Sequence, residues 1–246
     1  MRSIRLIGRL DIKNSNLIKS INLEGLRIVG NPNEFAKKYY DQGIDELILM
    51  DVVATLYGRN YLSEILKKIT QEIFIPITIG GGVRTIEDAK NLLLCGADKI
   101  AINSAAVQNP KFIKNLVNEI GSQSVVISIE AKERENWWEV YTSNGREPTG
   151  INVLDWINQT IEFGAGEILL TSIDKEGTRS GFDTKLIKKA SEICSIPLII
   201  SGGFGVKEHL DSVLKSQVDA VAVADSIHYN RHSIAEIKDY IEKINC

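Results

Sequence analysis

Short apolar runs alternate along the chain with stretches in which apolar residues recur every three or four positions. The runs are rich in Ile, Leu and Val and end in small or polar residues. Runs that are apolar on both faces are typical of parallel strands covered by helices. We predict strands at 4–11, 46–51, 75–79, 99–103, 125–130, 167–172, 198–201 and 220–224. We predict helices at 36–42, 61–70, 85–94, 109–120, 154–163, 184–193, 206–215 and 233–244.

The chain also repeats itself. IPITIGGGVR at 75–84 returns as IPLIISGGFG at 196–205, which is 121 positions later, and 45–51 and 98–104 match 166–172 and 219–225 at the same offset. Eight strand–helix units in two related halves, at a length near 250 residues, predict an α/β fold. We expect one (β/α)8 TIM barrel over residues 1–246, built from two homologous half-barrels. A doubly wound sheet is the alternative, but it does not require such repetition.

Composition excludes several classes of protein. The chain has 246 residues, 43% of them apolar and 25% charged, which is enough for a full core. A net charge of -3 gives no sign of a nucleic-acid or membrane partner. The three cysteines (Cys95, Cys194, Cys246) lack metal spacing and are odd in number, so we expect a cytoplasmic protein with reduced thiols.

Chemistry in a barrel belongs at the C-terminal ends of the strands. The first predicted strand is followed by a long segment at 12–32 that carries Lys13, Lys19 and Arg27, before a helix near Asn33. Such long loops are usually functional. We interpret this one as a cationic lid over a phosphorylated substrate, with plain solvated charge as the alternative.

Two glycine turns follow equivalent strands. The first cradle, as we name it, is Gly80, Gly81 and Gly82, and a helix is predicted to begin near Thr85; the second cradle is Gly202 and Gly203. Glycine lets backbone N–H groups approach an anion, and a helix N-terminus favours negative charge. Their repetition favours two phosphate sites. Four further residues end the strands beside them: Asn103 and Ser104 at the first, Ala224 and Asp225 at the second.

These motifs resemble a known family. LDIK, FIPITIGGGVR, KIAINSAAV, GAGEILLTSID and IISGGFG, spread over the whole chain, are similar to the cyclase subunit of imidazole glycerol phosphate synthase, an enzyme of histidine biosynthesis. The resemblance implies a lyase that forms a heterodimer with a glutaminase subunit and uses its ammonia on a bis-phosphorylated ribulosyl substrate, without a cofactor. The products would be imidazole glycerol phosphate and aminoimidazole carboxamide ribotide. It also implies that Lys19, Thr171, Gly177 and the two cradles bind the substrate.

The resemblance assigns the acid–base chemistry to Asp11 and to the residue at 130, where this chain has Glu130 in place of the family's aspartate. Two carboxylates can give and take protons on both faces of a substrate. The extra methylene of Glu130 would displace the carboxylate by about 1 Å, which can cost on the order of 10²-fold in rate. Three more positions depart from the family pattern: Arg9 replaces Cys, Glu176 replaces Asp, and Asp225 replaces Ser.

Four charged residues begin predicted strands. Arg5, Glu46, Lys99 and Glu167 match the ring that the family uses as an ammonia gate, and two charges of each sign favour a paired ring, because lone charges are costly in a barrel floor. Asp98, Gln123 and Trp156 also match the family near this end, where the resemblance implies docking of the glutaminase.

Asn144-Gly145 in the alternating segment 137–150 predicts a β-hairpin. His209, His228 and His232 share no spacing with acids or cysteines, so we expect neither a metal site nor a nucleophilic triad.

Three hypotheses remain. The first is the cyclase subunit itself. The second is a diverged paralogue that channels ammonia to another acceptor, such as an amidino sugar in surface-polysaccharide synthesis. The third is a catalytically silent barrel that activates a glutaminase.

Overall fold

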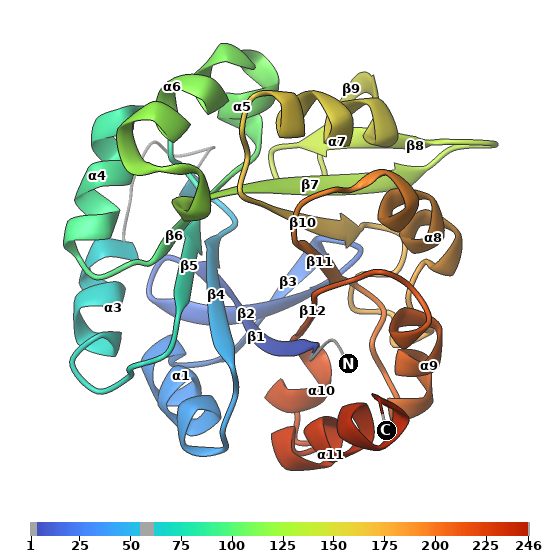
Figure 1. The fold of residues 1–246 in the computed structure, drawn as a ribbon. Coiled ribbons are helices and arrows are strands. Elements are labelled where there is room, and N and C mark those ends of the chain that lie inside the picture. Colours follow the sequence, from blue (N-terminus) through green and yellow to red (C-terminus); the bar gives the residue numbers. More distant parts are fainter. Residues whose placement is uncertain (1–3, 55–61, 246) are drawn as a thin grey trace.

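The computed structural model describes residues 4–54 and 62–245. Within these ranges, eight parallel strands pair in a closed ring, and β12 pairs with β1 to complete it (Figure 1). The predicted (β/α)8 barrel is therefore confirmed. Its strands are β1 (Arg5–Lys13), β4 (Glu46–Asp51), β5 (Ile77–Gly80), β6 (Lys99–Ile102), β7 (Val125–Glu133), β10 (Glu167–Ser172), β11 (Leu198–Ser201) and β12 (Ala220–Val223).

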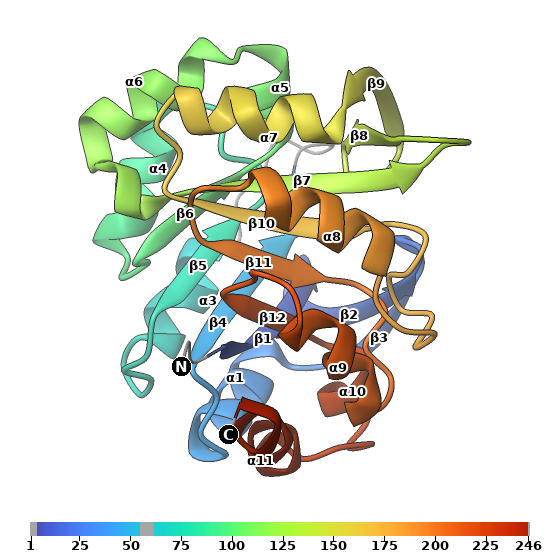
Figure 2. The same cartoon turned by 45° about the vertical axis from the view of Figure 1, so that its right-hand side comes forward.

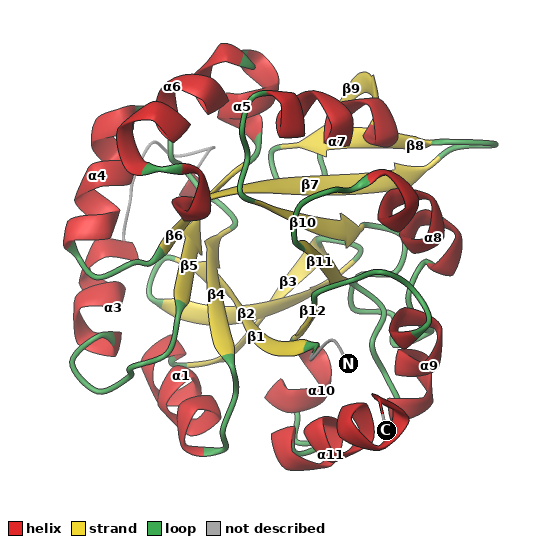
Figure 3. Cartoon of the chain, in the orientation of Figure 1, coloured by secondary structure: helices red, strands yellow, loops and turns green. Residues whose placement is uncertain are grey.

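Helices form the outer layer (Figure 3). Each predicted helix has a counterpart in the described ranges, residue 61 of the second one lying outside them: α1 (Pro32–Asp41), α3 (Leu62–Ile69), α4 (Ile86–Leu94), α6 (Lys111–Ile120), α7 (Val153–Glu162), α8 (Thr184–Ile193), the 3-10 turn η2 (Lys207–His209) with α9 (Leu210–Leu214), and α11 (Ile234–Asn245). Capping residues begin several of them, as where Asn31 accepts a hydrogen bond from the Asn33 N–H at the start of α1. The short elements α5 (Ser104–Gln108), η1 (Ser122–Ser124) and α10 (Asp225–His228) were not predicted.

Alternate residues of each strand face opposite sides of the ring. On β1, Leu6 and Leu10 belong to the large core between the strands and the helices, whereas Ile7 belongs to a separate apolar cluster inside the ring. The other members of this inner cluster are Ile48, Ala101, Val126, Leu169, Ile199, Ala220 and Ala222. The barrel interior is therefore a packed layer with polar residues above and below it.

The expected loop at 12–32 is wrong. The segment forms an antiparallel hairpin of β2 (Asn16–Ile21) and β3 (Glu24–Gly30), and β2 pairs with the end of β1. The hairpin predicted at 137–150 is confirmed as β8 (Trp138–Thr142) and β9 (Glu147–Asn152). The two hairpins follow equivalent strands of the two halves at nearly the 121-residue offset, which was the signal that could have identified the first one.

The turns of these two hairpins meet over the strand ends. The Asn144 side-chain amide donates to the Leu23 carbonyl at 3.3 Å, and these residues are 121 positions apart. Leu23 is buried against Tyr141 and Ile173. Figure 2 shows β2 and β3 on the same side of the ring as the β7–β8 end. The two hairpin turns therefore cover one side of the C-terminal end of the barrel, which we call the mouth.

The glycine turns have a structural cause as well as a functional interpretation. Gly81 has φ +100°, and a Cβ there would lie 2.2 Å from the Asp51 carbonyl oxygen. Gly203 has φ +104°, and a Cβ would lie 2.1 Å from the Gly181 carbonyl oxygen. Each turn therefore needs glycine to pass close to neighbouring backbone.

No helix among the described residues is both long enough and apolar enough to span a bilayer.

Candidate active site at the mouth of the barrel

Asp11 and Glu130 lie at the same end of the ring, on β1 and β7. Between them lies Arg9, whose side chain is buried. Its Nε donates to Asp11 Oδ1 at 2.9 Å, and its Nη1 donates to Thr171 Oγ1 at 2.9 Å and to Ser201 Oγ at 3.2 Å. Burial alone would lower the pKa of Arg9, but the charges of Asp11, Glu176 and Glu130 raise it above its ordinary value. Arg9 thus joins the two half-barrels inside the mouth.

Glu130 is the second buried carboxyl group. Burial raises its pKa to about 7, the hydrogen bond from the Gly145 N–H and the charge of Arg9 lower it, and the charge of Asp11 raises it. The Gly145 N–H donates to Glu130 Oε2 at 2.8 Å. The Asn-Gly turn of the second hairpin therefore reaches the candidate acid. At neutral pH a carboxyl group with this pKa can both give and take a proton.

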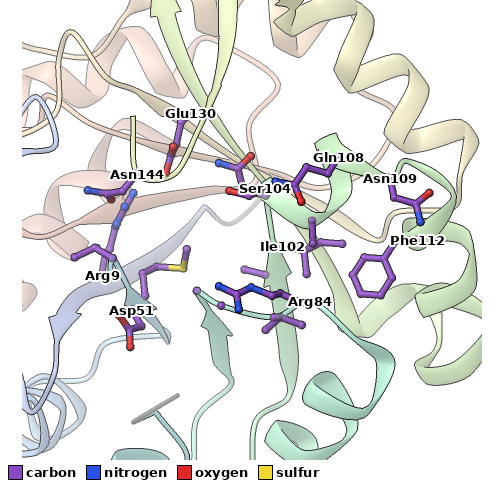
Figure 4. A pocket seen from close by; sticks show the side chains of 18 residues that line it. Arg9, Asp51, Arg84, Ile102, Ser104, Gln108, Asn109, Phe112, Glu130 and Asn144 are labelled. Carbon is purple, nitrogen blue, oxygen red and sulfur yellow. The ribbon is translucent and has the colours of Figure 1, made fainter. Parts of the chain in front are cut away.

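The first cradle opens onto a cavity of about 380 Å³ (Figure 4). Its lining brings together four residues predicted to bind phosphate, Gly81, Gly82, Asn103 and Ser104. Arg9 and Glu130 line the same cavity. The Ser104 hydroxyl accepts from the Ser143 N–H at 3.1 Å. Asn103 Nδ2 donates to the Tyr141 carbonyl at 3.1 Å, while its Oδ1 is buried without a hydrogen-bond partner among the described residues.

Asn144 and Arg84 also line this cavity and had no assigned role from the sequence. Figure 4 shows Arg9 extending toward Asn144 and Glu130, with Arg84 on the opposite side of the cavity. Arg84 Nη2 donates to the Ala54 carbonyl at 3.3 Å. Its place directly after the first cradle, in GGGVR, was the available signal.

The second cradle differs from the first. The space bounded by Gly177, Gly202, Gly203, Ala224 and Asp225 is only about 20 Å³. Lys19 lies here, but it is buried and paired with Glu176. Lys19 belongs to a strand, and its ammonium group points into the protein toward a carboxylate, so the alternative of plain solvated charge is wrong for Lys19. Contact of this segment with a phosphorylated substrate stays a prediction.

A ring of charges lies at the opposite end of the barrel. Arg5 donates to Glu46 at 2.5 Å and to Glu167 at 2.6 Å. Lys99 donates to Glu167 at 2.8 Å and to Glu46 at 3.3 Å. Each cation thus contacts both acids, and the four residues form the closed, alternating ring that the sequence suggested.

Two of the predicted docking residues lie on the surface near this ring. Asp98 and Gln123 are exposed, and Asp98 accepts from the Ile77 N–H at 2.8 Å. Trp156 is different, since it lies in the first turn of α7 and is 1% exposed within the core. An exposed docking role for Trp156 is therefore not met in this conformation.

No group of three or more His, Cys, Asp and Glu residues in the described ranges is arranged to hold a metal ion. Cys95 and Cys194 are free thiols, and Cys246 lies outside the described residues.

Comparison of the sequence with known proteins identifies the family of this chain. A family model described as "Histidine biosynthesis protein" matches residues 5–233. The chain belongs to this family. An imidazole glycerol phosphate synthase subunit HisF from Legionella pneumophila is 60% identical over 212 residues, which is 86% of this chain and 100% of the relative. The HisF subunit from Pyrococcus furiosus is 42% identical over 99% of this chain and 97% of its own length. That from Streptococcus sanguinis is 44% identical over 95% and 94%.

The histidine biosynthesis family resemblance inferred from the motifs is thus confirmed. Against the family pattern, the departures at 9, 176 and 225 are each matched by an opposite charge. Arg9 contacts Asp11, Glu176 contacts Lys19, and Asp225 contacts Arg231 at 3.2 Å.

Arg9→Met should destabilise the fold by about 3–5 kcal/mol, because it leaves the Asp11 carboxylate buried without its counter-ion. Urea unfolding measures the change. The double variant Arg9→Met/Asp11→Asn should regain much of that loss, since the unpaired charge is removed with its partner. Equal loss in the single and double variants would show that packing, and not the ion pair, sets the cost.

Glu130 predicts a pH dependence of stability. Its pKa in the folded protein, about 7, lies above its ordinary value of 4.5. The protonated carboxyl is favoured by folding, so its contribution is complete below pH 4.5 and is lost as pH rises through 7. Wild type should lose roughly 3 kcal/mol relative to Glu130→Gln between pH 4.5 and 8. Parallel stability curves for the two proteins would contradict the assignment.

Proposed function

We propose that this chain is the cyclase-type subunit of an imidazole glycerol phosphate synthase. It receives ammonia from a glutaminase subunit and converts a bis-phosphorylated ribulosyl aminoimidazole carboxamide substrate to imidazole glycerol phosphate and aminoimidazole carboxamide ribotide. The observation that carries the proposal is the polarity of one barrel: a closed ring of paired charges at one end, and two carboxyl groups beside an open glycine cradle at the other. We place the complex in the cytoplasm.

The layer between these ends supports ammonia as the transferred species. Most inward-facing residues between the charged ring and the mouth are apolar, and Ala101, Ala220 and Ala222 are small. Thr78 and Ser128 also face inward by strand register, and their hydroxyl groups are uncharged. An apolar lining favours neutral ammonia over the ammonium ion, because burying an unpaired charge is costly. Rearrangement of the ring would admit ammonia at one end and release it beside Asp11 and Glu130.

At the mouth, the two carboxyl groups have different surroundings. Asp11 Oδ1 accepts a hydrogen bond from Arg9, whereas its buried Oδ2 has no hydrogen-bond partner among the described residues. We assign this oxygen the role of base. Glu130, with a pKa near 7, supplies the proton that imine formation, elimination and ring closure each require. The first cradle, with Asn103 and Ser104, holds one phosphate of the substrate.

A second candidate is ammonia transfer to a different acceptor, such as an amidino sugar. It is favoured by Arg9 and Asp225, which place an added cation and an added anion inside the mouth. Turnover of the ribulosyl substrate and complementation of a histidine auxotroph distinguish the two functions. If the purified chain turns over the ribulosyl substrate with ammonia, and its gene complements a histidine auxotroph lacking the cyclase, the first function holds. If it stimulates a glutaminase but leaves that substrate intact, the result favours ammonia transfer to another acceptor or a catalytically silent activator.

The ring predicts an effect specific to the source of ammonia. Lys99→Met removes a cation that bridges Glu46 and Glu167, so glutamine-dependent turnover of the complex should fall several-fold while turnover with added ammonium salt changes less. The ratio of the two rates is the measurement. Lys90→Met, which removes only an exposed pair with Glu119, serves as the control. Equal loss from both nitrogen sources would argue against a gate.

A further inference from the structure

The second cradle has no room for a phosphate group. Its cavity of about 20 Å³ is close to the roughly 10–15 Å³ that one water molecule needs. Phosphate has five heavy atoms. The side chains of Glu176, Phe204 and Asp225 are among those that bound the space.

Charge also opposes a phosphate in the second cradle. Two carboxylates, Glu176 and Asp225, line it, and a carboxylate beside a phosphate repels it. The lining cation, Lys19, is already paired with Glu176. Backbone N–H groups alone would then have to compensate the nearly two negative charges of a bound phosphate.

A larger cavity of about 220 Å³ lies directly outside this cradle and shares Lys19, Gly177 and Asp225 with it. We call it the arginine pocket, because Arg27, Arg179 and Arg231 line it. Arg27 comes from β3, Arg179 from the loop after β10, and Arg231 from the segment after α10. Three separate segments therefore bring guanidinium groups to one space.

Asp225 organises two of these arginines. Its Oδ1 lies 3.2 Å from Arg231 Nε and 3.8 Å from Arg179 Nε. A guanidinium carries five N–H donors, so a contact through Nε leaves the Nη donors for another acceptor. The Arg231 guanidinium also lies over the Tyr229 ring, 5.3 Å from its centroid, which restricts its orientation.

The charges of the pocket match one ligand class. When Asp225 and Glu176 are set against Lys19 and the three arginines, two positive charges remain in excess. A phosphate monoester carries nearly two negative charges at neutral pH. Arginine also matches the geometry of phosphate oxygens with paired donors.

We propose that the arginine pocket binds a phosphate monoester, namely the second phosphate of the substrate, so that guanidinium side chains perform outside the second cradle what backbone N–H groups perform in the first. Asp225 in this arrangement is a positioning residue for Arg179 and Arg231. The inference deepens the proposed function and rests on it only for the identity of the molecule that carries the phosphate.

The test is a titration of the free protein with inorganic phosphate and with ribose 5-phosphate, followed by nuclear magnetic resonance. The Gly82 amide reports the first cradle, the Gly203 amide the second, and the Nε–H signals of Arg27, Arg179 and Arg231 report the arginine pocket. We expect saturable shifts at Gly82 and at the arginines. Arg231→Met and Arg179→Met should each weaken binding at the pocket roughly 10-fold, as expected for loss of a charge-assisted hydrogen bond, without changing the Gly82 titration.

Arg146→Met is the matched control, since Arg146 is exposed on the turn of the second hairpin. An unchanged Gly82 titration also shows that each variant is folded. Saturable shifts at Gly203 that are insensitive to Arg179→Met and Arg231→Met would overturn the proposal, as would a lack of any second site for either probe.

The readouts keep the two proposals separate. If the arginines bind both probes but the ribulosyl substrate is not turned over, the proposed function fails and the phosphate site stands. If the substrate is turned over and Arg231→Met leaves its KM unchanged, the proposed function stands and the arginine pocket is wrong.

Discussion

Closure of the strands into a ring is the constraint on which the rest of this molecule depends. A closed ring has one interior, and strand alternation assigns every second residue to it. On β1 this sequence is Arg5, Ile7, Arg9 and Asp11, with Ile7 in the inner apolar cluster and the three charged residues above or below it. A charge in such an interior is costly unless it is paired. The charged ring and the Arg9–Asp11 pair are both consequences of this requirement.

The same constraint explains why the two ends can have different chemistry. At the charged ring of Arg5, Glu46, Lys99 and Glu167, each cation contacts both acids. The charges neutralise one another and leave little for a ligand. At the mouth, pairing is incomplete, because Asp11 keeps an oxygen without a partner among the described residues and Glu130 has its pKa raised to about 7 by burial. Incomplete pairing beside a cavity is typical of a reactive site. One barrel therefore separates a neutralised charged ring from a mouth with incompletely paired groups by a mostly apolar layer.

Periodicity and repetition sufficed to predict the barrel, its strands and most of its helices, because both depend on local spacing of apolar residues. The hairpin at 16–30 was missed because its exposed strand, Glu24–Gly30, lacks the alternation of a half-buried strand. The charged ring was foreseeable from sign and position at four strand starts. The partners of Lys19 and Arg9 were not, since Glu176 and Thr171 lie 157 and 162 positions away from them, and side-chain orientation decides such contacts. Trp156 was expected near the charged ring, but it lies in the first turn of α7, where helix phase buries it.

Duplication gives two equivalent glycine turns at one mouth, and the side chains around them have made them unequal. In the first half, Gly81 and Gly82 border an open cavity with Arg84 on its wall. In the second half, Asp225 and Glu176 close the equivalent turn, yet each has an opposite charge at hand, Arg231 or Lys19. A repulsive substitution beside an anion site would be expected to abolish it, unless the cations that neutralise the substitution can themselves contact the anion. The three arginines outside the second cradle meet that condition, because two of them contact Asp225 while all three line the neighbouring cavity.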